Sequence, residues 1–169
     1  MGKRMIALFA AAALAVSALC GCTKHSVRKE LCADFKADFT AEYRGMKLAG
    51  KLMFTRQGDL SLTFSQPKTL DGLDVRYRNN TLSLSRDSAV CTADEGYLPE
   101  CSFPETVRSV LKAAAQGSAK PVERGGETVY RLSSAQLDCE ITADTDGMIG
   151  TVSANDGQLQ LLLSGAERI

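Results

Sequence analysis

The chain has 169 residues, of which 44 % are hydrophobic, and carries 20 basic and 20 acidic side chains. This length matches one domain, and a balanced charge argues against nucleic acid as a partner. The only histidine is His25, close to the N-terminus, which excludes a Ser-His-Asp catalytic set in the rest of the chain.

The first 22 residues have the three-part layout of an export signal. Lys3 and Arg4 precede an apolar and small-residue run from Met5 to Leu19, and Gly21 then comes directly before Cys22. The run is near the short limit of about 17 residues for a membrane span. We therefore expect the leader to be cleaved.

The stretch Leu19-Cys20-Gly21-Cys22 resembles a bacterial lipobox, in which an aliphatic residue and a small residue precede an obligatory cysteine. The resemblance implies a signal peptide over 1–21 and a diacylglyceryl group, with palmitate as a typical acyl chain, on Cys22. Each buried methylene contributes about 0.8 kcal/mol, so two chains would hold the protein on the extracytoplasmic face of a bacterial membrane. The alternatives are secretion after a cut near Ala18, or an uncleaved span.

Cleavage would leave 148 residues with 18 basic and 20 acidic side chains, because Lys3 and Arg4 leave with the leader. Residues 22–31 are mostly polar and basic, which indicates a lipid-anchored tether that includes His25. Residues 32–169 are long enough to bury a core of their own. We expect them to form a single domain.

Four thiols remain in that domain, an even number that suggests disulfide pairs outside the cytoplasm. Cys91 and Cys101 would close a short loop, and Cys32 and Cys139 would form the remaining pair. The alternative is four free thiols in the envelope of an anaerobe. We expect no metal site, since the domain has neither a Cys-x-x-Cys spacing nor a histidine.

Apolar and polar residues alternate over much of the domain, which predicts strands. Glycine, aspartate and asparagine lie between these segments, and Asn79-Asn80 in particular predicts a tight hairpin. The expected strands cover residues 33–44, 46–55, 60–65, 73–78, 82–84, 90–91, 128–132, 137–143, 148–154 and 158–163.

A helical pattern replaces the alternation from Ser102 to Gln116. Ser102 and Glu105 predict a capping box, Pro104 suits the first turn, and Gly117 is positioned to end the helix. The segment from Gly117 to Gly126 is expected to be a loop. A helix of about 14 residues spans about 21 Å, so it covers only four or five strands of the expected nine or ten. The remaining apolar surface must be buried by curling, by a second sheet or by a hydrophobic ligand.

Two soft motifs resemble proteins of the LolA-like and LolB-like lipoprotein-carrier fold. They are Phe64-Ser65-Gln66-Pro67-Lys68-Thr69-Leu70-Asp71-Gly72-Leu73 and the proline-bearing stretch from Leu98 to Phe103. The resemblance is greatest to LolA-like lipoproteins of Gram-positive anaerobes, including spore-germination lipoproteins. It implies a mainly β fold with one substantial helix, a curved antiparallel half-barrel whose concave face holds lipid.

Our leading functional hypothesis is a membrane-anchored lipoprotein that binds a lipid or another hydrophobic ligand without catalysis and without a cofactor. Alternation cannot distinguish such a ligand face from a filled core. The alternative role is a scaffold that localises or stabilises an envelope protein, as in sporulation or germination. The residues expected to form the hydrophobic-ligand face are Phe35, Phe39, Leu48, Leu52, Leu62, Phe64, Leu73, Val75 and Tyr77.

Overall fold

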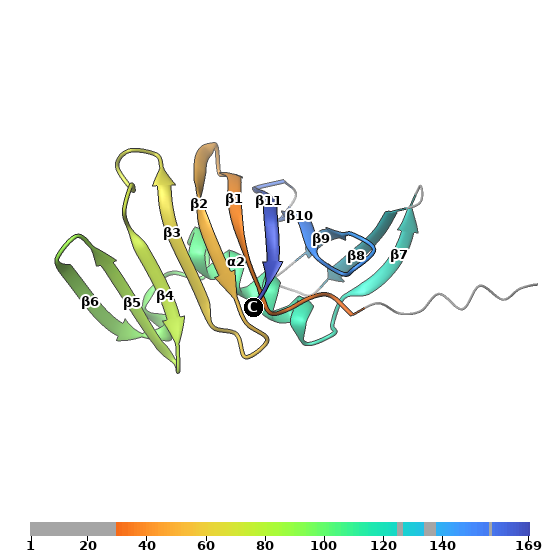
Figure 1. The fold of residues 1–169 in the computed structure, drawn as a ribbon, viewed down its shortest axis with the longest axis horizontal. Helices are drawn as coiled ribbons and strands as arrows, with labels where there is room; N and C mark the ends of the chain where they lie inside the picture. The colour runs from red at the N-terminus through yellow and green to blue at the C-terminus, as the bar shows by residue number, and fades with distance from the viewer. Residues whose placement is uncertain (1–29, 125–126, 134–137, 156) are drawn as a thin grey trace, which may run out of the picture.

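The computed structural model describes residues 30–124, 127–133, 138–155 and 157–169. These form one open antiparallel sheet that curls around a single α-helix, as the half-barrel prediction requires (Figure 1). The strands are β1 (Phe35–Tyr43), β2 (Met46–Phe54), β3 (Leu60–Gln66), β4 (Asp74–Arg78), β5 (Thr81–Arg86), β6 (Ala89–Asp94), β7 (Lys120–Arg124), β8 (Glu127–Ser133), β9 (Asp138–Ala143), β10 (Ile149–Ala154) and β11 (Leu159–Arg168). The helices are α2 (Phe103–Ala115) and the short 3-10 helix η1 (Glu95–Tyr97).

The strand order across the sheet is β6-β5-β4-β3-β2-β1-β11-β10-β9-β8-β7. The first and last strands are therefore neighbours at the centre, and two arms of consecutive hairpins extend to either side (Figure 1). Every pairing in the sheet is antiparallel. The predicted meander is confirmed, and the curling of the two arms buries the apolar face.

One strand lies where the sequence predicts a loop. β7 falls inside the Gly117–Gly126 segment and pairs with β8, with Val122 opposite Val129. Its sequence, Lys-Pro-Val-Glu-Arg, has only one large apolar residue and a proline, so it carries no alternating signal. β7 occupies an edge of the sheet, which is where a strand can tolerate proline.

The hairpin predicted at Asn79-Asn80 is present. Both asparagines have positive φ angles, 51° and 59°, as a two-residue turn between twisted strands requires. The turn between β1 and β2 uses the same device at Arg44 and Gly45, with φ angles of 51° and 80°. These turns set the register of the strand pairs that they join.

Helix α2 begins at Phe103 and ends before Gly117, as predicted, but the predicted capping box is wrong. The side chain of Ser102 makes no capping hydrogen bond. Instead, the Ser102 carbonyl oxygen accepts bonds from the backbone nitrogen and the hydroxyl of Thr106. Gly117 adopts a φ of 72° at the other end, which terminates the helix.

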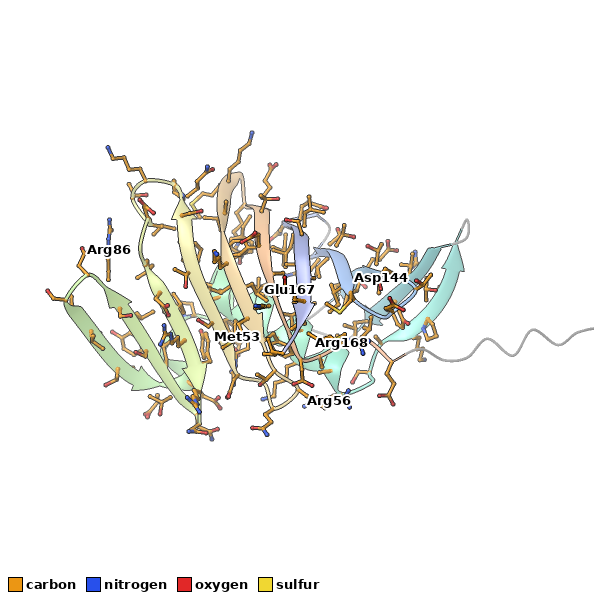
Figure 2. All side chains as sticks on the ribbon, viewed as in Figure 1. Met53, Arg56, Arg86, Asp144, Glu167 and Arg168 are labelled. Atoms are coloured by element: carbon orange, nitrogen blue, oxygen red, sulfur yellow. The ribbon has the colours of Figure 1, made fainter. Side chains whose placement is uncertain are left out.

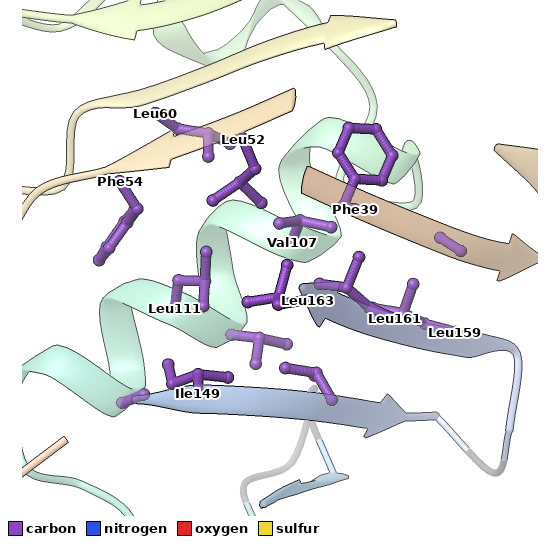
Figure 3. Close-up of a cluster of buried hydrophobic side chains, with 14 of the residues drawn as sticks. Phe39, Leu52, Phe54, Leu60, Val107, Leu111, Ile149, Leu159, Leu161 and Leu163 are labelled. Atoms are coloured by element: carbon purple, nitrogen blue, oxygen red, sulfur yellow. The ribbon is translucent and has the colours of Figure 1, made fainter. Parts of the chain in front are cut away.

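The helix lies in the concave face of the sheet, between its two arms. Val107 and Leu111 point toward side chains of β2, β3, β10 and β11 (Figure 3). A 13-residue helix covers only this central part, which agrees with the limit set by its length. Its buried residues are Phe103, Thr106, Val107, Val110, Leu111 and Ala114.

The core also includes the segment that precedes β1. Leu31, assigned to the tether in the sequence analysis, is 7 % exposed and packs in the same cluster as the strands. The backbone nitrogen of Cys32 donates to the Gly147 carbonyl at 2.7 Å. Among the described residues, no helix combines the length and hydropathy needed to cross a bilayer.

Gly50 on β2 occupies a place where a larger residue does not fit. The register between β2 and β3 shifts between Ala49 and Gly50, and an added Cβ would overlap the Thr63 carbonyl oxygen and lie 3.0 Å from the Phe39 ring. We expect Gly50→Ala to lower the free energy of unfolding by about 1–3 kcal/mol through overpacking, measured by urea denaturation.

Gly150→Ala on β10 is the matched control, because its added Cβ would meet only Thr142, at 3.8 Å. The control should change the free energy of unfolding by less than about 0.5 kcal/mol. Equal urea midpoints for Gly50→Ala and the natural chain would contradict the tight approach of β3 to Gly50.

Candidate functional site

Eight of the nine residues predicted to form the ligand face come together on the concave side of β1 to β4, and Leu73 directly precedes β4. Alternate residues of β1 are buried from end to end, because the two-residue period places every second side chain toward α2. Eight of the nine are only 0–4 % exposed, and Leu73 is partly buried at the edge of the cluster. In this structure the face is covered by side chains of α2.

Aromatic rings fix the first turn of α2 to the sheet. The Phe103 ring lies 5.8 Å from the Phe39 ring, 5.9 Å from the Phe64 ring and 5.6 Å from the Tyr43 ring, measured between centroids. The Tyr43 hydroxyl donates to the Cys101 carbonyl directly before the helix. The N-terminal end of α2 is thus held by apolar contact and by a hydrogen bond.

A charged cluster holds the same half of the helix. Arg108 Nη2 lies 2.7 Å from Glu95 Oε2 and its Nη1 lies 3.7 Å from Glu105 Oε1. Its Cζ lies 4.8 Å from the Tyr77 ring centroid, within cation–π range. Burial raises the pKa of the Tyr77 hydroxyl above its usual range, and the nearby Glu105 carboxylate adds to the rise. Because the Arg108 side chain is 12 % exposed, solvent screens these contacts less than it would surface ion pairs.

The C-terminal half of α2 is bound differently. The ion pairs of the described helix residues all involve Arg108, whereas the last turn consists of Ala113, Ala114 and Ala115. Small side chains make few contacts, so this half is held mainly by Val110 and Leu111. We expect it to separate from the sheet more easily than the N-terminal half.

A groove of about 260 Å³ lies at this end of the helix. It runs between the end of α2, the start of the β7–β8 arm and the segment that enters β1. Its walls combine apolar side chains with polar groups, and Arg56 Nη1 lies 3.8 Å from Glu30 Oε2 in the lining. The volume is slightly below the about 300–1,000 Å³ of typical small-molecule sites. The lining includes Leu31, Ala114, Gln116, Ala119, Pro121 and Tyr130.

The alternating pattern of the sequence does not reveal the groove, because the groove is lined by residues from four separate segments. Leu31 lies in the expected tether, while Ala119 and Pro121 lie in the expected loop. No single segment carries a local signal for it. Cys22, the predicted lipidation site, lies outside the described residues.

The four domain thiols are unpaired in the structure. Cys139 is buried at the start of β9, and burial raises the pKa of its thiol to about 11. The backbone nitrogen of Cys32 donates to Gly147, which follows the end of β9 at Ala143. The strand from Cys139 to Ala143 is about 13 Å long, so Cys32 lies at the other end of β9 from Cys139. A bridge needs Cα atoms within about 7 Å, so this pairing does not fit the arrangement. Cys91 and Cys101 are both exposed, and their pairing stays a prediction.

No metal site is evident in the described parts of the chain, where no group of three or more His, Cys, Asp or Glu residues comes together. The geometry provides a groove whose lining includes the core residues Leu31, Ala114, Ala119 and Tyr130. Such a site can bind an apolar part of a ligand.

The fold and groove define a small half-barrel domain with one helix in its concavity, and solved structures share this architecture. An uncharacterised conserved protein from Thermus thermophilus has a TM-score of 0.53 at 11 % identity, over 82 % of this chain and 80 % of that chain. This similarity establishes a common fold. No protein-family model matches the sequence, and no curated protein matches it.

Two more distant structures have TM-scores of 0.42. One is a putative outer membrane lipoprotein-sorting protein domain from Vibrio parahaemolyticus, 10 % identical over 83 % of this chain and 87 % of that chain. The other is a LolA superfamily protein from Nitrosomonas europaea, 6 % identical over 83 % of this chain and 88 % of that chain.

Proposed function

We propose that this chain is a lipid-anchored protein on the extracytoplasmic face of a bacterial membrane and binds a hydrophobic ligand, such as an acyl chain, under α2. The observation that carries the proposal is the groove at the C-terminal end of α2, whose lining includes residues of the same buried core cluster as the predicted ligand face. The role is binding without catalysis.

The position of the groove suits a ligand that comes from the membrane. Leu31 and Glu30 line it, and Glu30 is eight residues from Cys22. Eight extended residues reach at most about 29 Å. With Cys22 lipidated, the mouth of the groove would therefore stay within about 30 Å of the bilayer, close to a source of acyl chains.

Uptake of a whole acyl chain requires α2 to move, because the concave residues are already packed. The Arg108 cluster and the Phe103 rings hold the N-terminal half, so the alanine-rich last turn is the part that would lift. The ligand would then pack against the apolar side chains that the helix uncovers. Binding would thus exchange one apolar surface for another.

A tryptophan reporter tests this proposal, because the natural chain contains no tryptophan. Gln116 is exposed and lines the groove, so Gln116→Trp places a single reporter there. A brominated fatty acid quenches tryptophan only at short range. We expect saturable quenching of Gln116→Trp that is reduced at least tenfold when Ala115→Leu fills the groove.

Gln158→Trp is the matched control for the reporter. Gln158 is also exposed, but it lies in the β10–β11 turn, where its carbonyl accepts from Arg44. That turn is at the opposite end of β1 from the groove. Equal quenching of both reporters, or none of Gln116→Trp, would contradict a ligand site at the groove.

A scaffold role is the second candidate, and the packing of the concave face favours it. Eight of the nine residues of this face are only 0–4 % exposed, so the face is already buried and needs no ligand to shield it from water. Two results together would support this second role, as in sporulation or germination. They are the absence of quenching in Gln116→Trp and the recovery of one dominant protein crosslinked to this chain in membranes.

A further inference from the structure

The two edges of the sheet differ in how they are protected. Edge strands usually carry charges or proline, which prevent pairing with another chain. β7 follows this rule with Lys120 and Pro121. β6 does not, because its first five residues are Ala-Val-Cys-Thr-Ala, without charge or proline.

β6 is also open to solvent within the described structure. Its residues are exposed apart from the partly buried Ala93, and Val90 is 67 % exposed. α2 lies over the centre of the sheet, whereas Arg86 at the tip of the β5–β6 hairpin lies at the outer end of the arm (Figure 2). The edge is therefore accessible to a second strand.

The direction of the backbone groups on β6 follows from its pairing with β5. The Glu95 nitrogen donates to the Asn80 carbonyl at 3.1 Å, which makes these two residues a hydrogen-bonded pair. Hydrogen-bonded and non-hydrogen-bonded pairs alternate along an antiparallel ladder, so Cys91 bonds inward to β5. The backbone groups of Val90 and Thr92 consequently point out of the sheet edge.

We infer that two copies of this chain pair through β6, antiparallel about a two-fold axis, with Cys91 of one copy opposite Cys91 of the other. Two-fold pairing needs outward-pointing residues to oppose each other, and this register sets Val90 against Thr92 twice. All five uncharged residues then pair, and Asp94 falls beyond them, opposite Ser88. The register centred on Thr92 instead sets Asp94 against Val90, inside the interface.

A second copy suits this edge because the strand is complementary to itself. The same patch serves both sides of a two-fold interface, which is the commonest symmetry of protein oligomers. Cys91 would occupy a non-hydrogen-bonded pair, where Cα atoms are about 4.5 Å apart and side chains share a face. This spacing is within the range of a disulfide, so Cys91 reports the register.

Oxidative crosslinking of the full chain in its own membranes tests the inference. When two thiols form a disulfide, two protons are released to the solvent and two electrons pass to two copper(II)-phenanthroline complexes. We expect a dimer on non-reducing gels that falls at least tenfold in Cys91→Ser. Cys101→Ser, which removes the other thiol that is exposed in the described part of the chain, should leave the dimer at its natural level or raise it.

Two edge variants test the strand pairing itself. Val90→Lys adds an edge lysine at a solvent-exposed site, and Thr92→Pro removes an outward N–H that makes no bond within the sheet. Both should reduce the Cys91 crosslink at least tenfold. Leu162→Lys, at a residue 52 % exposed on the central strand β11, is the control and should leave it unchanged within twofold.

Several outcomes would overturn the inference. They are a dimer that survives Cys91→Ser, a crosslink unaffected by both edge variants, and the absence of any dimer. A Cys91 adduct with the mass of a different protein would also overturn it, because the edge would then serve a foreign strand.

Discussion

Phe103→Ala is expected to lower the free energy of unfolding by about 3–5 kcal/mol, a large part of the about 5–15 kcal/mol typical of a domain. The ring is 5 % exposed and lies within 6 Å of three other aromatic rings. Its loss removes these contacts and leaves a cavity at the start of α2. Circular dichroism should record a melting temperature lower by about 10 °C or more.

Leu162→Ala provides the comparison for this loss. It also removes a large apolar side chain, but one that is 52 % exposed on the solvent side of β11. We expect a change below about 0.5 kcal/mol. If Phe103→Ala melted within about 2 °C of the natural chain, the helix would not depend on the aromatic contacts that fix its first turn.

Cys22→Ala is expected to abolish incorporation of labelled palmitate and to move the chain from the membrane fraction to the soluble fraction. The reason is that two acyl chains, at about 0.8 kcal/mol per buried methylene, would supply the anchor. An unmodified leader would be cut near Ala18. The folded part should melt as before, since its described core begins at Leu31.

Cys20→Ala separates lipidation of Cys22 from a general need for thiols in the leader. Cys20 is two residues upstream and would leave with the signal peptide. Labelling and membrane attachment should therefore be unchanged. Palmitate that remains on the Cys22→Ala chain would place the modification elsewhere.

The sequence predicts the central strands well, because the two faces of each strand meet different environments. Residues of β1 alternate between the core and solvent over all nine positions, and a period of two records this directly. β7 escaped prediction because an exposed edge strand with proline needs no alternation. Its position depends on pairing with β8, which local sequence does not encode.

The candidate site is predictable only in part for a related reason. The nine concave residues share a face because strand geometry dictates it, so their gathering could be predicted. Whether side chains or a ligand cover them depends on the fit of α2, a long-range property. The groove combines Leu31, Gln116 and Tyr130, which are far apart in sequence. Only the closed sheet and the docked helix bring them together.

The pairing of β1 with β11 has a consequence for the order of events in the cell. Phe39 is opposite Leu163, so the two arms meet only through a contact that spans nearly the whole domain. Closing such a long loop is slow and entropically costly, and the pairing of β1 with β11 cannot begin before the last strand is present. A chain that crosses a membrane from its N-terminus therefore has no complete sheet until its C-terminus emerges. If the chain is exported as proposed, this topology would keep the sheet incomplete until export is complete.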